Sequence, residues 1–176
     1  EEAYLPSFID LSANSRLGVW WWVGNDLADP NTRAYLNFLQ KNGVTDIYGG
    51  FDAGSYANTA AFIEAANDRG MRVSALGGDS SWVDANPNGF DAYLEAYTAY
   101  QAWAAANGRG QLYAMHLDVE PYVPSEDRRV EIWGNYADLV EEAYTATRTA
   151  GVRLEWCTSA WLDGYTSDGR EIVADN

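Results

Sequence analysis

The stretch "QLYAMHLDVEPY", residues 111–122, decides which fold this chain is expected to adopt. Its side chains alternate between an apolar set, Tyr113, Met115, Leu117 and Val119, and a second set, Ala114, His116, Asp118 and Glu120. A strand places alternate side chains on opposite faces. The pattern therefore predicts a strand with one apolar face, suited to packing under helices, and one face that carries an imidazole and two carboxylates.

Short apolar runs alternate with helical patterns on both sides of this stretch. The predicted strands are 17–24, 44–52, 72–79, 111–122 and 152–161. The predicted helices begin at the cap Asp29 with Pro30 in the first turn and end at Gly43, then cover 57–70, 87–107 and the residues after Ser125. No linker interrupts this series, so we expect a single domain over 1–176 with a parallel sheet covered by helices.

Two α/β architectures fit this order of elements. One is an open five-stranded sheet of the flavodoxin type, and the other is the first five units of a TIM-type (β/α)8 barrel. Central strands of an open sheet lie under helices on both faces and are apolar throughout, so the polar face of 111–122 favours the partial barrel. We expect the strands to be adjacent in chain order. Three strands would then be missing: the chain is a fragment, a second chain completes it, or the barrel is incomplete.

The composition limits the partners of this protein. Its 11 Lys and Arg against 26 Asp and Glu give a net charge of −15, which argues against binding nucleic acid or an anionic membrane surface. No run of about 18 apolar residues is present, so no membrane span is expected. The single cysteine, Cys157, excludes an internal disulfide, and we expect no cofactor. Among 8 Trp and 12 Tyr, most should fill the core and some should offer flat faces to sugar rings.

The carboxylates of 111–122 carry the candidate chemistry. Asp118 and Glu120 are about 6.6–6.8 Å apart along a strand, on one face. Two neighbouring carboxylates of low exposure do not both ionise readily, so one of them can serve as a general acid, the group that glycoside hydrolysis requires. The alternative is that both pair with arginine or cap a loop. His116 either hydrogen-bonds Asp118 or is a core residue whose hydrogen bonds are made elsewhere. A metal site formed by His116, Asp118 and Glu120 is disfavoured because His116 and Glu120 lie about 13 Å apart along the strand.

The motif "LDVEP", 117–121, at the end of the fourth strand of a βα series resembles the Asp-x-Glu signature of (β/α)8 glycoside hydrolases, such as chitinases and barrel-type muramidases. The resemblance implies that Glu120 is the acid/base and that Asp118 orients a substrate N-acetyl group, which acts as the nucleophile. The chitinase motif has further aspartates upstream, where this chain has Ala114 and His116. The expected function is hydrolysis of a polysaccharide. The start "EEAYLPSF" is compatible with a mature protein that is secreted or held at the cell surface.

The ends of the other predicted strands should line the same site. The candidate sugar contacts are His116, Asp52, Asp79, Trp82, Tyr122 and Trp161. Alternation places Trp21 opposite Trp20 and Trp22, so at least one of these three is a core residue. The alternative function is a non-catalytic carbohydrate-binding or cell-surface module on a hydrolase-like barrel. A flavodoxin-like cofactor domain is disfavoured because "VGNDLADP", 23–30, lacks a phosphate-binding glycine pattern.

Overall fold

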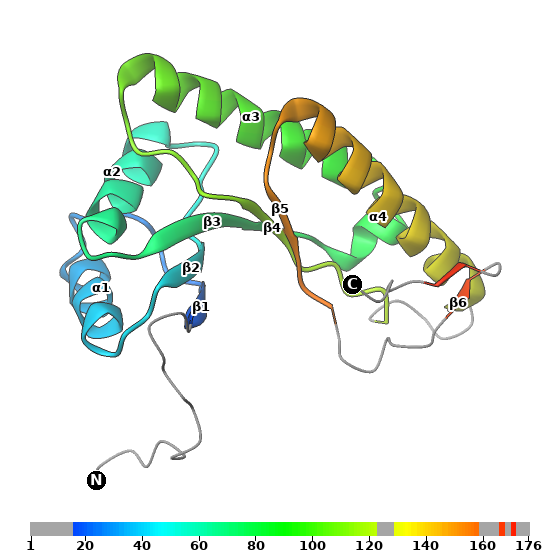
Figure 1. Cartoon of the computed structure of the whole chain (residues 1–176), viewed down its shortest axis with the longest axis horizontal. Coiled ribbons are helices and arrows are strands. Elements are labelled where there is room, and N and C mark those ends of the chain that lie inside the picture. The colour runs from blue at the N-terminus through cyan, green and yellow to red at the C-terminus, as the bar shows by residue number, and fades with distance from the viewer. Residues whose placement is uncertain (1–15, 123–128, 159–165, 168–169, 172–176) are drawn as a thin grey trace, which may run out of the picture.

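The computed structural model describes residues 16–122, 129–158, 166–167 and 170–171. Strands and helices alternate through most of this part of the chain (Figure 1). The elements are β1 (Gly18–Trp21), α1 (Pro30–Lys41), β2 (Asp46–Gly49), α2 (Tyr56–Asn67), β3 (Arg72–Gly77), the short 3-10 helix η1 (Ser80–Val83), α3 (Gly89–Asn107), β4 (Met115–Leu117), α4 (Arg129–Ala150), β5 (Leu154–Trp156), β6 (Thr166–Ser167) and β7 (Arg170–Glu171). The protein is therefore an α/β protein, as the alternating pattern predicts.

The five strands β1 to β5 form one parallel sheet in the order β1-β2-β3-β4-β5. This order confirms the prediction of neighbours in chain order and differs from the 2-1-3-4-5 order of flavodoxin-type sheets. A separate pair, β6 and β7, is antiparallel. The strands are shorter than predicted, and β4 covers only Met115–Leu117 of the stretch 111–122. Single hydrogen bonds extend the pairing beyond it, since the Asp118 N–H donates to the Gly77 carbonyl at 2.8 Å.

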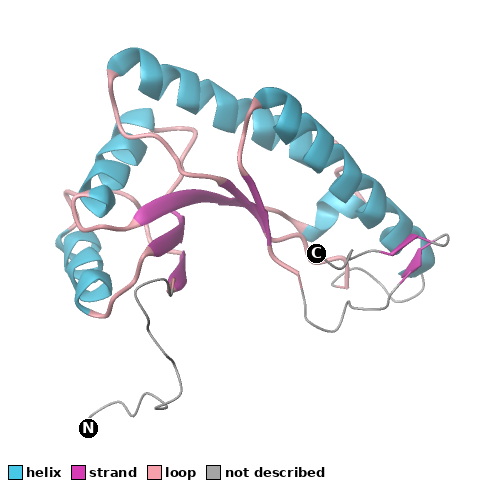
Figure 2. Cartoon of the chain, viewed as in Figure 1, coloured by secondary structure: helices cyan, strands magenta, loops and turns pink. Residues whose placement is uncertain are grey.

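The helices α1 to α4 all lie on the convex face of a curved sheet (Figure 2). The opposite, concave face is called the inner face below. Local sequence explains the helix ends well. The Asp29 side chain accepts a hydrogen bond from the Asn31 N–H at 2.9 Å, Pro30 occupies the first turn, and Gly43 follows the helix at φ 72°. None of the described helices is both long enough and apolar enough to span a membrane.

The core lies between the convex face of the sheet and the helices. Met115 and Leu117 are fully buried there, and Val119 is 3% exposed, which confirms the alternation expected for these residues. Trp21 is also buried and packs against Phe62 of α2 with ring centroids 5.0 Å apart. Each large apolar side chain buried in this way contributes about 1.5–3 kcal/mol to the stability of the fold.

The edge of the sheet at which the strands begin, called the amino edge, is ionic. Buried Asp46 accepts hydrogen bonds from Arg16 at 2.5 and 3.0 Å and forms an ion pair with Arg72 at 2.8 Å. Burial by itself would raise the pKa of Asp46, but the bonds from Arg16 and Thr45 outweigh burial and hold that pKa below its usual value.

Tyr113 departs from the predicted alternation. It lies before β4 and outside the apolar core, where the guanidinium groups of Arg72 and Arg153 are 4.2 and 4.6 Å from its ring centroid. Arg16 lies near the same ring, at 5.9 Å. The prediction that Tyr113 packs under helices is therefore wrong, because arginines at the beginnings of three other strands attract the face of its ring.

Candidate active site

The strands are parallel, so all five end at one edge of the sheet, called the carboxyl edge. Asp118 and Glu120 follow β4 directly at this edge, where a cavity of about 170 Å³ opens. This cavity is called the carboxylate cavity. Its lining residues come from segments far apart in the sequence and are Trp20, Asp118, Val119, Glu120, Pro121, Tyr122, Tyr136, Cys157 and Thr158. The structure therefore brings together three predicted site residues: Asp118, Glu120 and Tyr122.

The end of β3 holds the backbone of Asp118 in position. Gly78 has φ 117°, a conformation that residues with a side chain rarely adopt. A Cβ atom at Gly78 would lie 2.5 Å from the carbonyl oxygen of Asp118. Only a residue without a side chain allows the two backbones to approach this closely, so Gly78 is part of what fixes the first carboxylate.

The two carboxylates have hydroxyl and thiol neighbours. The Tyr122 hydroxyl donates a hydrogen bond to Oε1 of Glu120. Burial raises the pKa of the Cys157 thiol, and the charge of Asp118, a hydrogen bond with Asp118 and the charge of Glu120 raise it further. Among the described residues, no lysine or arginine forms an ion pair with either carboxylate. No positively charged side chain in the described part of the chain therefore neutralises the carboxylates of Asp118 and Glu120.

A second polar group lies on the inner face below the carboxylate cavity. The register of β4 and β5 places Glu155 opposite His116, and Nδ1 of His116 lies 3.4 Å from Oε2 of Glu155. The Ser74 hydroxyl donates to the same oxygen at 3.1 Å, and the Tyr48 ring stacks on the imidazole with centroids 4.1 Å apart. His116 thus contacts Glu155, and its Nε2 is buried without a hydrogen-bond partner among the described residues.

The residues that sequence reasoning missed in these two groups include Glu155, Ser74, Tyr48, Cys157 and Trp20. A signal for Glu155 was available, because it is a charged residue between Leu154 and Trp156 of a short strand, the same pattern that identified His116. The sequence marks Trp20 only as one member of the aromatic triplet 20–22. No local pattern marks Ser74 or Cys157 as partners of residues on neighbouring strands.

The other predicted contacts are spread along the carboxyl edge. Asp52 lines a separate cavity of about 290 Å³, called the tryptophan cavity. The lining residues of this cavity lie in the last two residues of β1, β2 and β3 or in the segments after β1 and β2, and are Trp21, Trp22, Val23, Gly24, Asn25, Gly49, Gly50, Phe51, Asp52 and Leu76.

Asp79 and Trp82 line neither of these cavities and have local structural contacts. Asp79 caps η1 by accepting a hydrogen bond from the Ser81 N–H at 2.7 Å, and its hydrogen bonds with Ser81 lower its pKa. Trp82 packs near Phe90 and Tyr93, with ring centroids 6.4 and 5.9 Å away. The candidate Trp161 lies outside the described residues.

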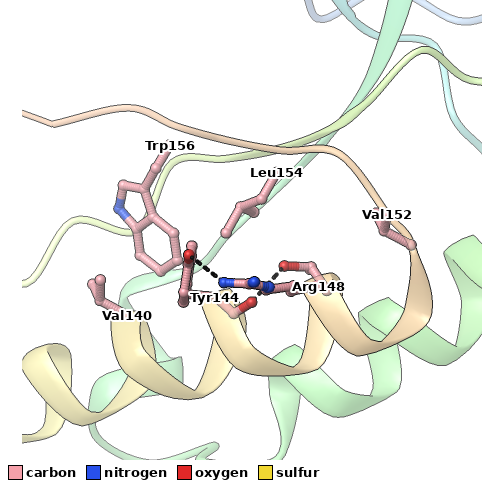
Figure 3. A pocket seen from close by; sticks show the side chains of 7 residues that line it. Val140, Tyr144, Arg148, Val152, Leu154 and Trp156 are labelled. Atoms are coloured by element: carbon pink, nitrogen blue, oxygen red, sulfur yellow. Dashed lines mark hydrogen bonds between the residues drawn. The ribbon is translucent and has the colours of Figure 1, made fainter.

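A larger cavity, of about 490 Å³, lies on the helix side between α4 and β5 (Figure 3). Its walls are mostly apolar and include Val140, Leu154 and Trp156. The Arg148 guanidinium donates to the Tyr144 hydroxyl at 3.1 Å within it. The described residues that line this cavity include no Asp or Glu.

The carboxylate cavity combines a candidate proton donor, a second carboxylate and an aromatic wall. Trp20 is 46% exposed and supplies a flat face beside the acids. Within the residues that the structure describes, no three His, Cys, Asp or Glu side chains gather closely enough to hold a metal ion. The chemistry that these described side chains can perform is acid–base catalysis on a ligand with flat apolar faces. No protein-family model matches the chain.

Proposed function

We propose that this protein is a glycoside hydrolase that cleaves a polysaccharide, with Glu120 as the proton donor and Asp118 as its partner. One observation carries the proposal: both carboxylates line a single aromatic-walled cavity at the carboxyl edge, and no described cation neutralises them. Carboxyl ends of parallel strands are where enzymes of the βα-barrel class carry their active sites.

The same proposal includes the architecture, in which the five-stranded sheet is part of the wall of a (β/α)8 barrel. The described helices support it because they all lie on one face of the sheet, whereas a doubly wound sheet has helices on both faces. The polar inner face, with His116 and Glu155, is suited to a barrel lumen. The apolar cavity between α4 and β5 is suited to packing of a further βα unit, which a longer chain or a second chain would supply.

The proposed reaction begins with protonation of the glycosidic oxygen by Glu120. The Tyr122 hydroxyl occupies Oε1 of Glu120, so Oε2 is left to carry the proton. On a substrate that carries an N-acetyl group, the N-acetyl oxygen attacks the anomeric carbon as the bond from this carbon to the leaving oxygen breaks, and Asp118 orients the N-acetyl group. Glu120, now a carboxylate, then takes a proton from the water that opens the intermediate.

The substitution Glu120→Gln tests this assignment. General acid catalysis contributes about 10²–10⁴-fold, so the variant should lose at least about 100-fold in turnover of chitin, peptidoglycan or a neutral glucan, whichever the native protein cleaves. Asp118→Asn should lose less, because Asp118 orients the substrate and donates no proton. Glu95→Gln, on the exposed surface of α3, is the matched control and should retain full activity. Native-like turnover by a folded Glu120→Gln variant would refute the role of Glu120.

The second candidate function is a non-catalytic carbohydrate-binding module. The exposure of aromatic side chains at the carboxyl edge favours it, since Trp22 is 79% and Tyr122 44% exposed and neither needs a catalytic neighbour to bind a sugar ring. A native protein that binds these polysaccharides but leaves them intact would support the binding module over the hydrolase.

A further inference from the structure

The tryptophan cavity lies beside the carboxylate cavity at the same edge of the sheet. Trp22 in its wall is the most exposed of the large apolar side chains in the described part of the chain, at 79%. Single exposed apolar residues are common on protein surfaces. Here, however, Trp20, Trp22, Val23 and Tyr122 are all more than 40% exposed, and all line one of two neighbouring cavities.

Buried Trp21 fixes the two exposed tryptophans relative to each other. It is 5% exposed, packs on Phe62, and its indole N–H donates to the Gly24 carbonyl at 3.4 Å. Trp20 lines the carboxylate cavity and Trp22 lines the tryptophan cavity. Both are bonded directly to Trp21, so one anchored segment serves both cavities. The backbone that carries the two exposed tryptophans is thus anchored, so it needs little ordering when a ligand binds.

The polar groups of the tryptophan cavity are also fixed in place. Asn25, which is 9% exposed, donates through Nδ2 to the Gly50 carbonyl at 2.9 Å and to the Thr59 hydroxyl at 3.1 Å. The Asp52 carboxylate accepts a hydrogen bond from the Gly54 N–H at 2.8 Å through Oδ1. The second oxygen of Asp52 is left as an acceptor for a ligand hydroxyl. Flat apolar walls with a few fixed polar groups are typical of small-molecule sites.

The charge of the carboxyl edge restricts the ligand. The described segments that follow the first four strands, 22–29, 50–55, 78–88 and 118–122, contain no lysine or arginine. They contain the acids Asp26, Asp29, Asp52, Asp79, Asp84, Asp118 and Glu120. Arg33 of α1 reaches this edge, where its guanidinium donates to the Leu27 carbonyl, but the acids outnumber it. A ligand with carboxylate, sulfate or phosphate groups is therefore disfavoured at this edge.

We infer that the tryptophan cavity binds a second sugar ring of the chain that is cleaved at Glu120, and that this chain is an extended polysaccharide without anionic groups. The ring stacks on Trp22 and hydrogen-bonds to Asp52. The strands β2 and β4 are two strand spacings apart, about 10 Å, a length that a short oligosaccharide spans. The inference rests on the proposed function, to which it adds the form and charge of the substrate.

Binding measurements with short and long oligosaccharides of chitin and of a neutral glucan test the inference. The measurements use the Glu120→Gln background so that the ligand stays intact. Affinity should rise with chain length, and Trp22→Ala should weaken binding of the long oligosaccharides about tenfold while short ones bind as before. Trp22→Tyr should retain most of the gain. Phe38→Ala, which removes an exposed aromatic ring from α1, is the matched control and should change nothing.

The outcomes separate this inference from the proposed function. Length-dependent binding that needs Trp22, in a protein without hydrolase activity, supports the second site and overturns the catalytic role. Hydrolysis with unchanged binding by Trp22→Ala overturns the second site and leaves the catalytic role standing. Equally strong binding of an oligogalacturonide overturns the restriction on charge, and a native protein that binds none of these oligosaccharides overturns both proposals.

Discussion

At the amino edge of the sheet, Asp46 is buried and its carboxylate forms ion pairs with Arg16 and Arg72. At the carboxyl edge, Asp118 and Glu120 are half-buried beside a thiol and a phenol, and no described cation pairs with them. The same kind of side chain thus has two different roles. Paired charge holds strand ends together, whereas unpaired charge in a cavity remains available for a ligand.

Among the substitutions that test the difference between the two edges, we expect the largest loss of stability from one in the backbone of the carboxyl edge. Gly78→Ala forces a side chain into φ 117° and against the carbonyl of Asp118. We expect a loss of about 3 kcal/mol in the free energy of unfolding, measured by denaturant titration.

Gly43→Ala is the matched control for this change. Gly43 also has positive φ, 72°, but a Cβ atom there meets nothing within 4 Å. Its loss should be about 1 kcal/mol, from the backbone conformation alone. Equal losses at the two glycines would mean that contact with Asp118 contributes nothing.

The next effect concerns the paired charge of the amino edge. Asp46→Asn removes the charge that Arg16 and Arg72 surround, and we expect it to lower the free energy of unfolding by about 2 kcal/mol at neutral pH. Asp52→Asn is the same substitution at the exposed carboxyl edge and should change stability by less than about 0.5 kcal/mol. If both variants unfold at the same denaturant concentration, the assignment of a structural role to the amino edge is wrong.

The stabilising effect of Asp46 also depends on pH. Its folded-state pKa lies below the value of about 3.9 that an unfolded aspartate has, so the contribution is complete above that value and disappears as the pH falls through the folded-state pKa. The difference in stability between the native protein and Asp46→Asn should therefore shrink in acid, below about pH 4. A difference that stays constant down to pH 2 would contradict this linkage.

The smallest expected effect is a change in the pKa of Cys157 at the carboxyl edge. Asp118→Asn removes one of the charges that raise the pKa of Cys157, so that pKa should fall toward its ordinary value, although burial keeps part of the shift. The pH dependence of alkylation of this cysteine, the only one in the chain, measures the change. Asp52→Asn, in the neighbouring cavity, should leave the alkylation profile unchanged. An identical profile for Asp118→Asn would show that the thiol does not sense Asp118.

Features that depend on adjacent residues could be predicted from the sequence. Asp29 and Pro30 mark the start of α1 because capping uses residues one turn apart. The burial of Met115 and Leu117 follows from the alternation of a single strand.

Features that depend on neighbouring strands could not be predicted in the same way. Glu155 meets His116 because of the register between β4 and β5, which the pattern of one strand does not specify. Tyr113 leaves the apolar set because arginines from other strand ends gather around its ring. Likewise, Trp20 of β1 reaches the cavity beside Glu120 only through the arrangement of the whole sheet.

Because β1 to β5 pair in parallel, the segments at the carboxyl edge of the sheet can change during evolution without disturbing the amino edge. Each segment that leaves β1, β2, β3 or β4 at the carboxyl edge leads into a helix before the chain returns to the ionic amino edge. Segments such as 51–55 can therefore be lengthened, shortened or exchanged with little effect on the ion pairs of Asp46. For a laboratory library that aims at new ligands, these segments are the places to diversify, and Gly78 together with the residues that surround Asp46 should be kept constant.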